Sequence, residues 1–194
     1  LLLGLLKPDS GDILFNGISL KSNDIAIEKL VGYVPQDIGL LDDTVRRNIA
    51  FGLNDDEIDD AKLLAAIEKA QLTEMIDSME LGLNTIIGEK GTRLSGGQRQ
   101  RIAIGRALYN DPKIVIFDEA TSSLDVVTES NITNTLESLR TEKTIIIIAH
   151  RINTVQKCEK LFFLKNGSCT AEGSFEELNA EYPEFAEWVK KAQI

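Results

Sequence analysis

Residues 113–125 read KIVIFDEATSSLD, a short apolar run that ends in two carboxylates and a polar segment. Residues 113–117 are mostly β-branched or aromatic and do not alternate with polar residues, and residues 144–149, TIIIIA, have the same character. Continuous runs of this kind are typical of strands that are buried on both faces of a parallel sheet. Residues 126–140 between them have a helical pattern. The three segments predict a β-α-β unit, and therefore an α/β fold.

The segments before this unit predict the end of a helix and two short strands. The opening LLLGLLK is apolar and is followed by Pro8 and Gly11, residue types that end helices. It is much shorter than the roughly 20 apolar residues of a membrane span, and it lacks the basic start and the cleavage site of a secretory signal. Residues 12–15 predict a strand, Asn16-Gly17 a tight turn, and residues 31–35 a second strand.

Residues 41–110 predict a helical insertion. Thr44 has the side chain of an N-cap before a helix at residues 44–50, and residues 55–76 predict further helix. Within that second stretch, a period of about 3.6 residues predicts one buried face, with charges on the other. The positions that follow this period are Ala61, Leu64, Ala65, Ile67, Glu68 and Leu72.

The end of the chain predicts a hairpin followed by two short helices. Residues 160–165 and 168–172 are strand candidates that Asn166-Gly167 joins, and Phe185 and Trp188 are expected to dock the last helix. There is no internal repeat and no long linker. With 194 residues, 43% of them hydrophobic, the chain is expected to form one domain with a subdomain.

The charge and the cysteines exclude some kinds of partner. The formal net charge is −10, whereas nucleic-acid-binding surfaces are usually basic, so no nucleic-acid partner is expected. Cys158 and Cys169 have no C-x-x-C spacing, and together with the single histidine, His150, they are too few for a zinc site. A nucleotide site is compatible with this charge, because local amides, a cation and one or two basic residues can hold phosphates.

Residues 94–108, LSGGQRQRIAIGRAL, contain the strongest single motif. Ser95 can cap a helix, while Gly96 and Gly97 lack side chains and let backbone N–H groups approach an anion. The helix that follows directs the positive end of its dipole to the same place. As an isolated feature, however, Ser-Gly-Gly before a helix indicates only an ordinary N-cap.

Polar side chains also follow the predicted strands. Asp118 and Glu119 come at the carboxyl end of a buried strand, where open α/β sheets bind ligands. One carboxylate there can hold Mg²⁺, which takes one or two protein carboxylates besides phosphates, and the next can deprotonate an attacking water. Gln36 and His150 follow two other strands and can reach a metal, a water or a phosphate. Each of them alone can also be a solvated or structural residue.

In this order, Gln36, LSGGQ, IVIFDE, SLD and His150 resemble the motifs of the ATP-binding-cassette (ABC) nucleotide-binding domain. Residues 48–52, 88–91 and 149–151 resemble the exporter type of this domain. The resemblance covers essentially the whole chain. It implies a P-loop NTPase (RecA-like) core with a mainly parallel sheet, formed by residues 1–40 and 111–194, and a helical subdomain at residues 41–110. It also implies ATP and Mg²⁺ as cofactors, and ATP hydrolysis as the activity.

The resemblance gives roles to four residues at the strand ends. Gln36 matches the Q-loop glutamine, which contacts Mg²⁺ and water and couples to the membrane domain. Asp118 matches the Walker B aspartate at Mg²⁺, and Glu119 matches the catalytic glutamate that polarises the attacking water. His150 matches the switch histidine.

Other matching residues belong to motifs that act across a head-to-tail dimer with two ATP molecules. The residues that match the signature motif, which clasps the γ-phosphate of ATP held by the opposite subunit, are Leu94, Ser95, Gly96, Gly97 and Gln98. Residues 122–125 match the D-loop. Asp125 alone would be interpreted as the cap of the helix that follows it.

The P-loop of the family, G-x-x-x-x-G-K-[ST], does not occur in the sequence. The opening leucines fit the end of the helix that follows a P-loop, so we expect an exporter-type transport ATPase cut off just after it, and an inactive chain in isolation. Its expected partners are a second nucleotide-binding domain and a transmembrane domain, at the cytoplasmic face of the inner membrane. The expected cargo is a lipid, a lipid-linked glycan, a drug or a peptide.

Two alternatives belong to other functional classes. A chromosome-maintenance or repair ATPase would favour DNA and would separate its halves by long coiled coils. The acidic charge, the compact spacing and the exporter-like residues 88–91, GEKG, count against it. A degenerate module without a P-loop would only dimerise or regulate, and the sequence upstream of Leu1 would decide this alternative.

Overall fold

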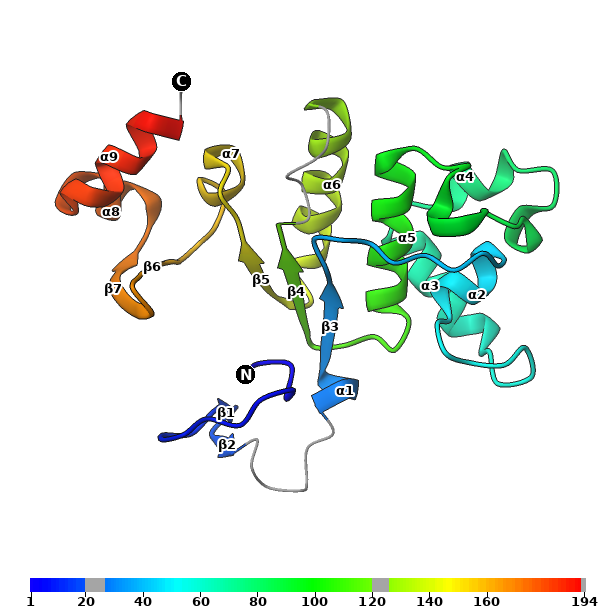
Figure 1. The fold of residues 1–194 in the computed structure, drawn as a ribbon, viewed down its shortest axis with the longest axis horizontal. Coiled ribbons are helices and arrows are strands. Elements are labelled where there is room, and N and C mark those ends of the chain that lie inside the picture. Colours follow the sequence, from blue (N-terminus) through cyan, green and yellow to red (C-terminus); the bar gives the residue numbers. More distant parts are fainter. Residues whose placement is uncertain (20–26, 120–125, 193–194) are drawn as a thin grey trace. The chain divides into compact units, whose positions relative to one another are not determined.

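The computed structural model describes residues 1–19, 27–119 and 126–192 (Figure 1). The chain divides into two compact units, residues 1–148 and 149–194, and each is described by itself. In the described part of the chain, no helix has the length and apolarity that crossing a membrane requires.

A parallel sheet is the centre of the first unit. It contains β3 (Val31–Val34), β4 (Ile114–Asp118) and β5 (Thr144–Ile148), in the order β3-β4-β5. Helix α6 (Val126–Leu139) connects β4 to β5, so the predicted β-α-β unit and the α/β fold are confirmed. The sheet brings the carboxyl ends of all three strands to one edge.

The two apolar runs differ in burial. The three central residues of β4 are buried, as the continuous run predicts, whereas the central residues of β5 are half-buried and its two ends are exposed. The prediction that both strands are buried on both faces is therefore wrong for β5. Among the described strands β4 has a neighbour on each side, but β5 pairs with β4 alone, which leaves it at an edge.

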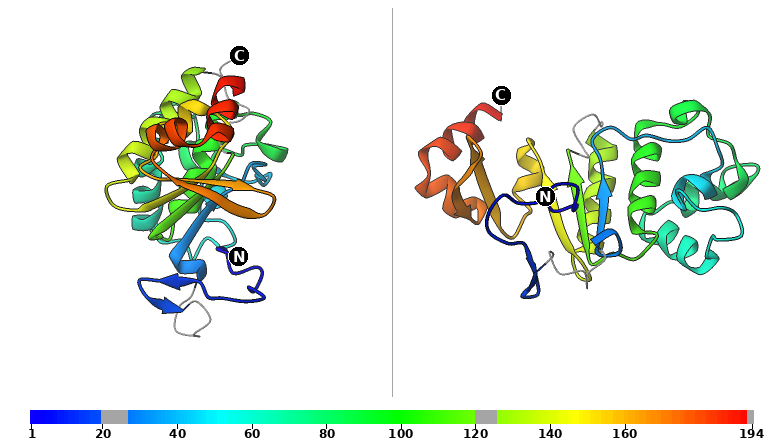
Figure 2. Two further views of the ribbon diagram at one scale, coloured as in Figure 1. Left: turned by 90° about the vertical axis from the view of Figure 1, so that its left-hand side faces the viewer. Right: turned by 60° about the horizontal axis from the view of Figure 1, so that its bottom comes forward.

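Helix α5 (Gly96–Leu108) packs close to β3 and runs antiparallel to it. A Cβ atom added at Gly32, near the start of β3, would lie 2.5 Å from the carbonyl oxygen of Ala107, near the end of α5. Only a glycine permits this approach. The N-terminus of α5 therefore points to the edge where the strands end, and Figures 1 and 2 show this arrangement.

Short helices fill residues 45–91 of the first unit. They are α2 (Val45–Ile49), α3 (Asp60–Lys69), α4 (Thr73–Asp77) and the 3₁₀ turns η1 (Gly82–Asn84) and η2 (Glu89–Gly91). The Thr44 hydroxyl accepts a hydrogen bond of 3.2 Å from the backbone N–H of Arg47, which confirms the predicted N-cap.

The predicted buried face of α3 is largely wrong. The helix buries Leu63, Ala66 and Ile67, while Leu64 is 60% exposed. Ala61 and Ala65 are exposed as well, so of the predicted positions in this helix Ile67 alone is buried. Apolar residues occupy adjacent positions here, and the period cannot distinguish two faces one residue apart. Packing against α5 selects the face.

The opening of the chain is not helical, contrary to the prediction. Residues 1–6 form turns, with one hydrogen bond from the N–H of Gly4 to the carbonyl of Leu1, and Gly4 has a φ of +73°, which no α-helix contains. The predicted hairpin turn is confirmed, because β1 (Leu14–Phe15) and β2 (Ile18–Ser19) are antiparallel. Helix α1 (Ile27–Leu30) leads into β3.

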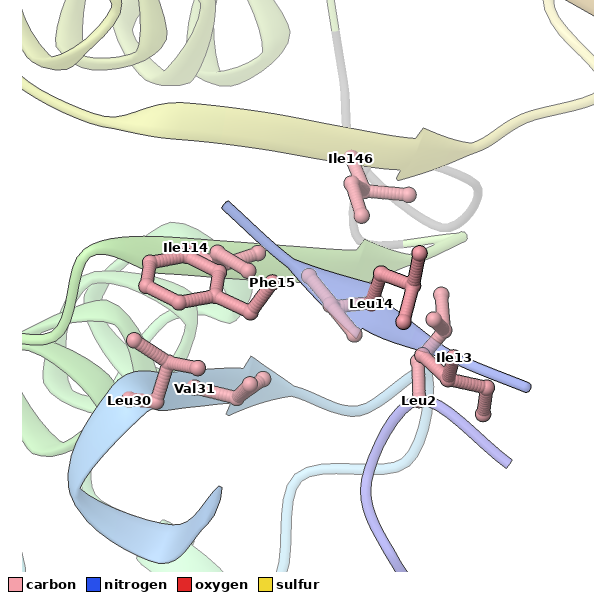
Figure 3. Close-up of a pocket in the computed structure, with 9 residues that line it drawn as sticks. Leu2, Ile13, Leu14, Phe15, Leu30, Val31, Ile114 and Ile146 are labelled. Carbon is pink, nitrogen blue, oxygen red and sulfur yellow. The ribbon is translucent and has the colours of Figure 1, made fainter. Parts of the chain in front are cut away.

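The hairpin lies near the sheet face opposite α5. Leu14 and Phe15 line an apolar pocket together with Ile114, Ile116 and Ile146 of the sheet (Figure 3). Every side chain that lines this pocket is apolar. It therefore offers no side-chain donor for a phosphate. The polar residues lie at the carboxyl edge of the sheet instead.

The second unit contains the predicted hairpin and closing helices. Strands β6 (Leu161–Lys165) and β7 (Ser168–Gly173) are antiparallel, and α7 (Ile152–Val155) precedes them. Helices α8 (Phe175–Glu181) and α9 (Pro183–Ala192) follow. Phe185 is buried, with the rings of Phe163, Phe175 and Trp188 at centroid distances of 5.5–5.6 Å, which confirms the predicted docking of α9.

Candidate functional site

Two carboxylates lie at the carboxyl end of β4. Asp118 is the last residue of the strand and Glu119 follows it, and both are partly exposed. The neighbouring strand β3 ends at the same edge, which brings Gln36 close. The Gln36 side-chain Nε2 donates a hydrogen bond of 2.9 Å to Oε2 of Glu119. The structure thus places three of the predicted site residues together.

The backbone of Glu119 turns sharply. Its φ is +47°, a left-handed conformation that costs a non-glycine residue of order 1 kcal/mol or more. Its N–H donates a hydrogen bond of 2.9 Å to the carbonyl of Ile148, the last residue of β5. This bond continues the sheet by one step past β4, so the turn that carries the Glu119 side chain is fixed to the central sheet.

Asp118 has a partner that the sequence did not predict. The hydroxyl of Tyr33 donates a hydrogen bond of 2.9 Å to Oδ2 of Asp118. Burial, the hydrogen bond to Asp118 and its negative charge together raise the pKa of Tyr33. The register explains the contact: Tyr33 pairs with Ile116, so Asp118, two residues further on, lies on the same face and diagonal to Tyr33.

These side chains suit a hard cation that takes most of its ligands from other groups, such as substrate phosphates. Carboxylate and amide oxygens are the donors that Mg²⁺ prefers, and Mg²⁺ usually binds one or two carboxylates together with substrate phosphates. Within residues 1–19, 27–119 and 126–192, no group of three or more His, Cys, Asp or Glu side chains is arranged to hold a metal. The carboxylates of Asp118 and Glu119 match the one or two protein carboxylates that Mg²⁺ takes besides phosphates.

The signature residues form a capping box at the start of α5. The Ser95 hydroxyl accepts a hydrogen bond of 3.2 Å from the N–H of Gln98, and the Gln98 side-chain oxygen accepts one of 2.8 Å from the N–H of Ser95. Leu94 is buried and anchors the segment, while Gly97 is buried and Gly96 half-buried. The structural interpretation as an N-cap is confirmed, and anion binding there stays a prediction.

For two predicted site residues, the place relative to the carboxylates stays a prediction. His150 is exposed and belongs to the unit of residues 149–194. Asp125 lies outside the described residues, as does the rest of the segment 122–125.

The sequence as a whole resembles known transport proteins. A model of the ABC transporter family matches residues 1–122. The chain belongs to this family. The match includes Gln36, the signature residues and the two carboxylates of β4.

Curated relatives of this ABC transporter chain are named as a flippase or as transporters. It is 42% identical over 177 residues to the ATP-dependent lipid A-core flippase of Cupriavidus pinatubonensis, covering 89% of this chain and 30% of that protein. It is 42% identical over 176 residues to the mitochondrial iron-sulfur clusters transporter ATM1 of Saccharomyces cerevisiae, with coverage of 89% and 25%. A multidrug resistance ABC transporter ATP-binding and permease protein of Lactococcus lactis is 37% identical over 188 residues, with coverage of 95% and 31%.

The fold agrees with these relatives. A solved bacterial Atm1-family ABC exporter with ATP bound matches all of this chain with a TM-score of 0.87 and 34% identity, over 34% of its own length. This likeness confirms the expected P-loop NTPase fold class. The chain spans about a third or less of the length of the relatives named here.

Proposed function

We propose that this chain forms most of the ATP-binding and ATP-hydrolysing module of an ABC exporter. The observation that carries the proposal is the contact of Gln36 with Glu119, beside Asp118, at the carboxyl edge of the parallel sheet. The same edge faces the N-terminus of α5, which begins with the signature residues. A strand edge with carboxylates suits a nucleotide with its metal, and a helix N-terminus suits a phosphate.

In this proposal Glu119 is the general base. Its carboxylate takes a proton from the water that attacks the terminal phosphate, and Gln36 holds Oε2 in a fixed orientation through its 2.9 Å hydrogen bond. Asp118 would hold Mg²⁺, and Tyr33 orients the Asp118 carboxylate through Oδ2. When bound, Mg²⁺ supplies a Lewis acid that polarises the phosphoryl oxygens. His150 is assigned the role of a phosphate sensor on the resemblance alone.

The N-terminus of α5 acts on ATP held by a second copy of the module. The N–H groups of Gly96 and Gly97 are the first of the helix and have no intrahelical acceptor, so they can donate to a phosphate. Asp125 is assigned to the same dimer contact by the resemblance. The sequence contains no G-x-x-x-x-G-K-[ST] motif, so we expect the 194-residue chain alone to bind Mg-ATP weakly.

The whole protein would place this module at the cytoplasmic face of a membrane. Its partners would be a transmembrane domain and a second nucleotide-binding domain, and residues 41–110 would be its helical subdomain. The named relatives carry lipid A-core, iron-sulfur clusters or drugs. We propose a lipid, lipid-linked glycan, drug or peptide as cargo.

The substitution Glu119→Gln tests this function in a full-length protein that carries the chain and a P-loop. Loss of the base should slow ATP hydrolysis by roughly 10²- to 10⁴-fold, while ATP binding persists and an ATP-bound dimer accumulates. Phosphate release and size-exclusion chromatography measure the two effects. The control is Glu68→Gln, an exposed position on α3. Hydrolysis by Glu119→Gln at the rate of the control would show that Glu119 is not the base.

A further inference from the structure

A half-buried cation near the end of α5 binds one segment of the chain. The Arg106 side chain donates hydrogen bonds to the carbonyl of Gly39 at 2.8 Å, to the carbonyl of Asn48 at 2.8 Å and to Oδ1 of Asn48 at 3.2 Å. The guanidinium carbon also lies 4.3 Å from the centroid of the Phe51 ring. Burial lowers the pKa of Arg106. These partners are carbonyls, an amide and an aromatic ring, and none of them carries a charge.

Asn48 extends the same network into the loop. Its side chain is fully buried, its Oδ1 accepts a hydrogen bond of 2.9 Å from the N–H of Leu41, and its Nδ2 donates to the carbonyls of Leu41 at 3.1 Å and Thr44 at 3.0 Å. Arg106 and Asn48 therefore hold the backbone of residues 39–44 at several points. We call Arg106, Asn48 and residues 39–44 the joint.

The joint lies between two parts of the proposed site. Gln36 is three residues before Gly39, a span of at most about 11 Å in an extended chain. Arg106 lies ten residues after Gly96 on the same helix, roughly 15 Å along its axis. The joint therefore connects the loop that carries Gln36 to the helix that begins with the signature residues.

Packing alone does not explain a guanidinium at this position. A cation that is partly removed from water loses part of its hydration, and an apolar side chain of similar size would fill the space without that loss. The planar fork of arginine, by contrast, directs several N–H groups in fixed directions at once. Here all of these donors bind the segment between Gly39 and Asn48, so their effect is to fix that segment to α5.

We propose that Arg106 and Asn48 are positioning residues. They fix the position of the Gln36 side chain relative to the Glu119 carboxylate, and they make this position depend on the orientation of α5. A tilt or shift of α5 moves Gly39, and through three residues it moves Gln36 toward or away from Oε2 of Glu119. The inference rests on the proposed function for its consequence in hydrolysis. The coupling itself is a property of the chain without nucleotide.

Solution NMR of the 194-residue chain tests the coupling. The side-chain amide signals of Gln36 are assigned by their loss in Gln36→Ala, and Glu119→Ala gives their positions when the acceptor is gone. Arg106→Lys keeps a positive charge but cannot make the three directed bonds. It should move the Gln36 signals most of the way to their positions in Glu119→Ala, and hydrogen exchange at the Leu41 amide should become about tenfold faster.

The matched control is Arg101→Lys, because Arg101 lies on the same helix and donates to the carbonyl of Gln71 instead. It should change neither signal. If Arg106→Lys speeds exchange at Leu41 while Gln36 keeps its wild-type signals, the joint holds only its own loop and the proposal is wrong.

A second variant keeps the test decisive should Arg106→Lys fail to fold. Phe51 is 51% exposed, so Phe51→Leu removes the ring beside Arg106 with little loss of core packing. It should shift the Gln36 signals in the same direction by a smaller amount, and unchanged signals would again contradict the proposal. Shifted signals in a chain whose full-length Glu119→Gln variant hydrolyses ATP normally would support the joint and overturn the proposed function.

Discussion

The two ends of the central sheet carry charged side chains in opposite ways. At the amino end, Nζ of the buried Lys143 lies 2.6 Å from a carboxylate oxygen of Asp111 and donates to the carbonyl of Pro112 at 2.7 Å. At the carboxyl end, two adjacent carboxylates accept hydrogen bonds from a phenol and an amide, those of Tyr33 and Gln36. Opposite charges stabilise the first end, whereas like charges concentrate at the second. The first cluster pairs opposite charges and serves the fold, and the second offers two carboxylates of the kind that bind a hard cation.

The largest effect is expected on ATP hydrolysis, from a substitution at the carboxyl end of the sheet. Asp118→Asn removes the carboxylate proposed to bind Mg²⁺, so ATP hydrolysis by the full-length protein should fall by about 10³-fold, comparable to the loss of other catalytic groups. The melting temperature of the chain should change little, because asparagine keeps the shape of the side chain and an oxygen that can accept from the Tyr33 hydroxyl. Phosphate release and calorimetry measure the two quantities. A variant that melts earlier but hydrolyses normally would place Asp118 with the structural cluster.

The next effect concerns the amino end. Lys143 has a side chain only 2% exposed, and Lys143→Met leaves the carbonyl of Pro112 without this donor. The free energy of unfolding should fall by about 1–3 kcal/mol, the usual loss for an unsatisfied buried polar group. Urea denaturation measures it, with the exposed Lys62→Met as the control. Equal stability of the two variants would contradict a stabilising role for the amino-end cluster.

A smaller effect is expected from Tyr33→Phe. This change removes only the hydroxyl that donates to Asp118, and a single hydrogen bond contributes about 1 kcal/mol. The Mg²⁺ concentration for half-maximal hydrolysis should rise by roughly fivefold, with the maximal rate nearly constant. Tyr109→Phe is the control, since its hydroxyl accepts from the N–H of Asp59 in the helical part. A reduced maximal rate at unchanged Mg²⁺ requirement would refute the orienting role.

The smallest effect is a pH dependence of stability at the amino end. Hydrogen bonds from Lys143 and, to a smaller degree, Lys69 hold the pKa of Asp111 below its ordinary value. The folded state therefore gains stability above the unfolded pKa of about 3.9, and it loses that gain as the pH falls below this value. Because Asp111 is 64% exposed, solvent screening keeps the effect small. Asp111→Asn should flatten the melting temperature between pH 5 and pH 3, roughly the range in which Asp titrates.

Local signals in the sequence predicted the parts of this molecule that local physics controls. A strand buried on two faces needs an unbroken apolar run, which identified β4, and Thr44 and Ser95 marked helix starts because their hydroxyls cap free N–H groups. The β-α-β unit followed from the order of these elements.

Non-local packing controls what was missed. The buried face of α3 depends on where α5 lies, and the exposure of β5 depends on which strands surround it. Tyr33 meets Asp118 only because the register pairs it with Ile116, and no pattern within either strand contains that register. The positive φ of Gly4 is not compatible with an α-helix, so the opening leucines do not form one.

The contact between Gly32 and Ala107 also offers a way to change the orientation of α5. Any side chain at position 32 would act as a wedge between β3 and the last turn of α5, and the rigid helix would transmit the displacement to its other end as a tilt. A protein engineer could therefore retune the signature residues from a position that touches none of them. Alanine, serine and valine at position 32 would form a series in which the size of the side chain sets the size of the displacement.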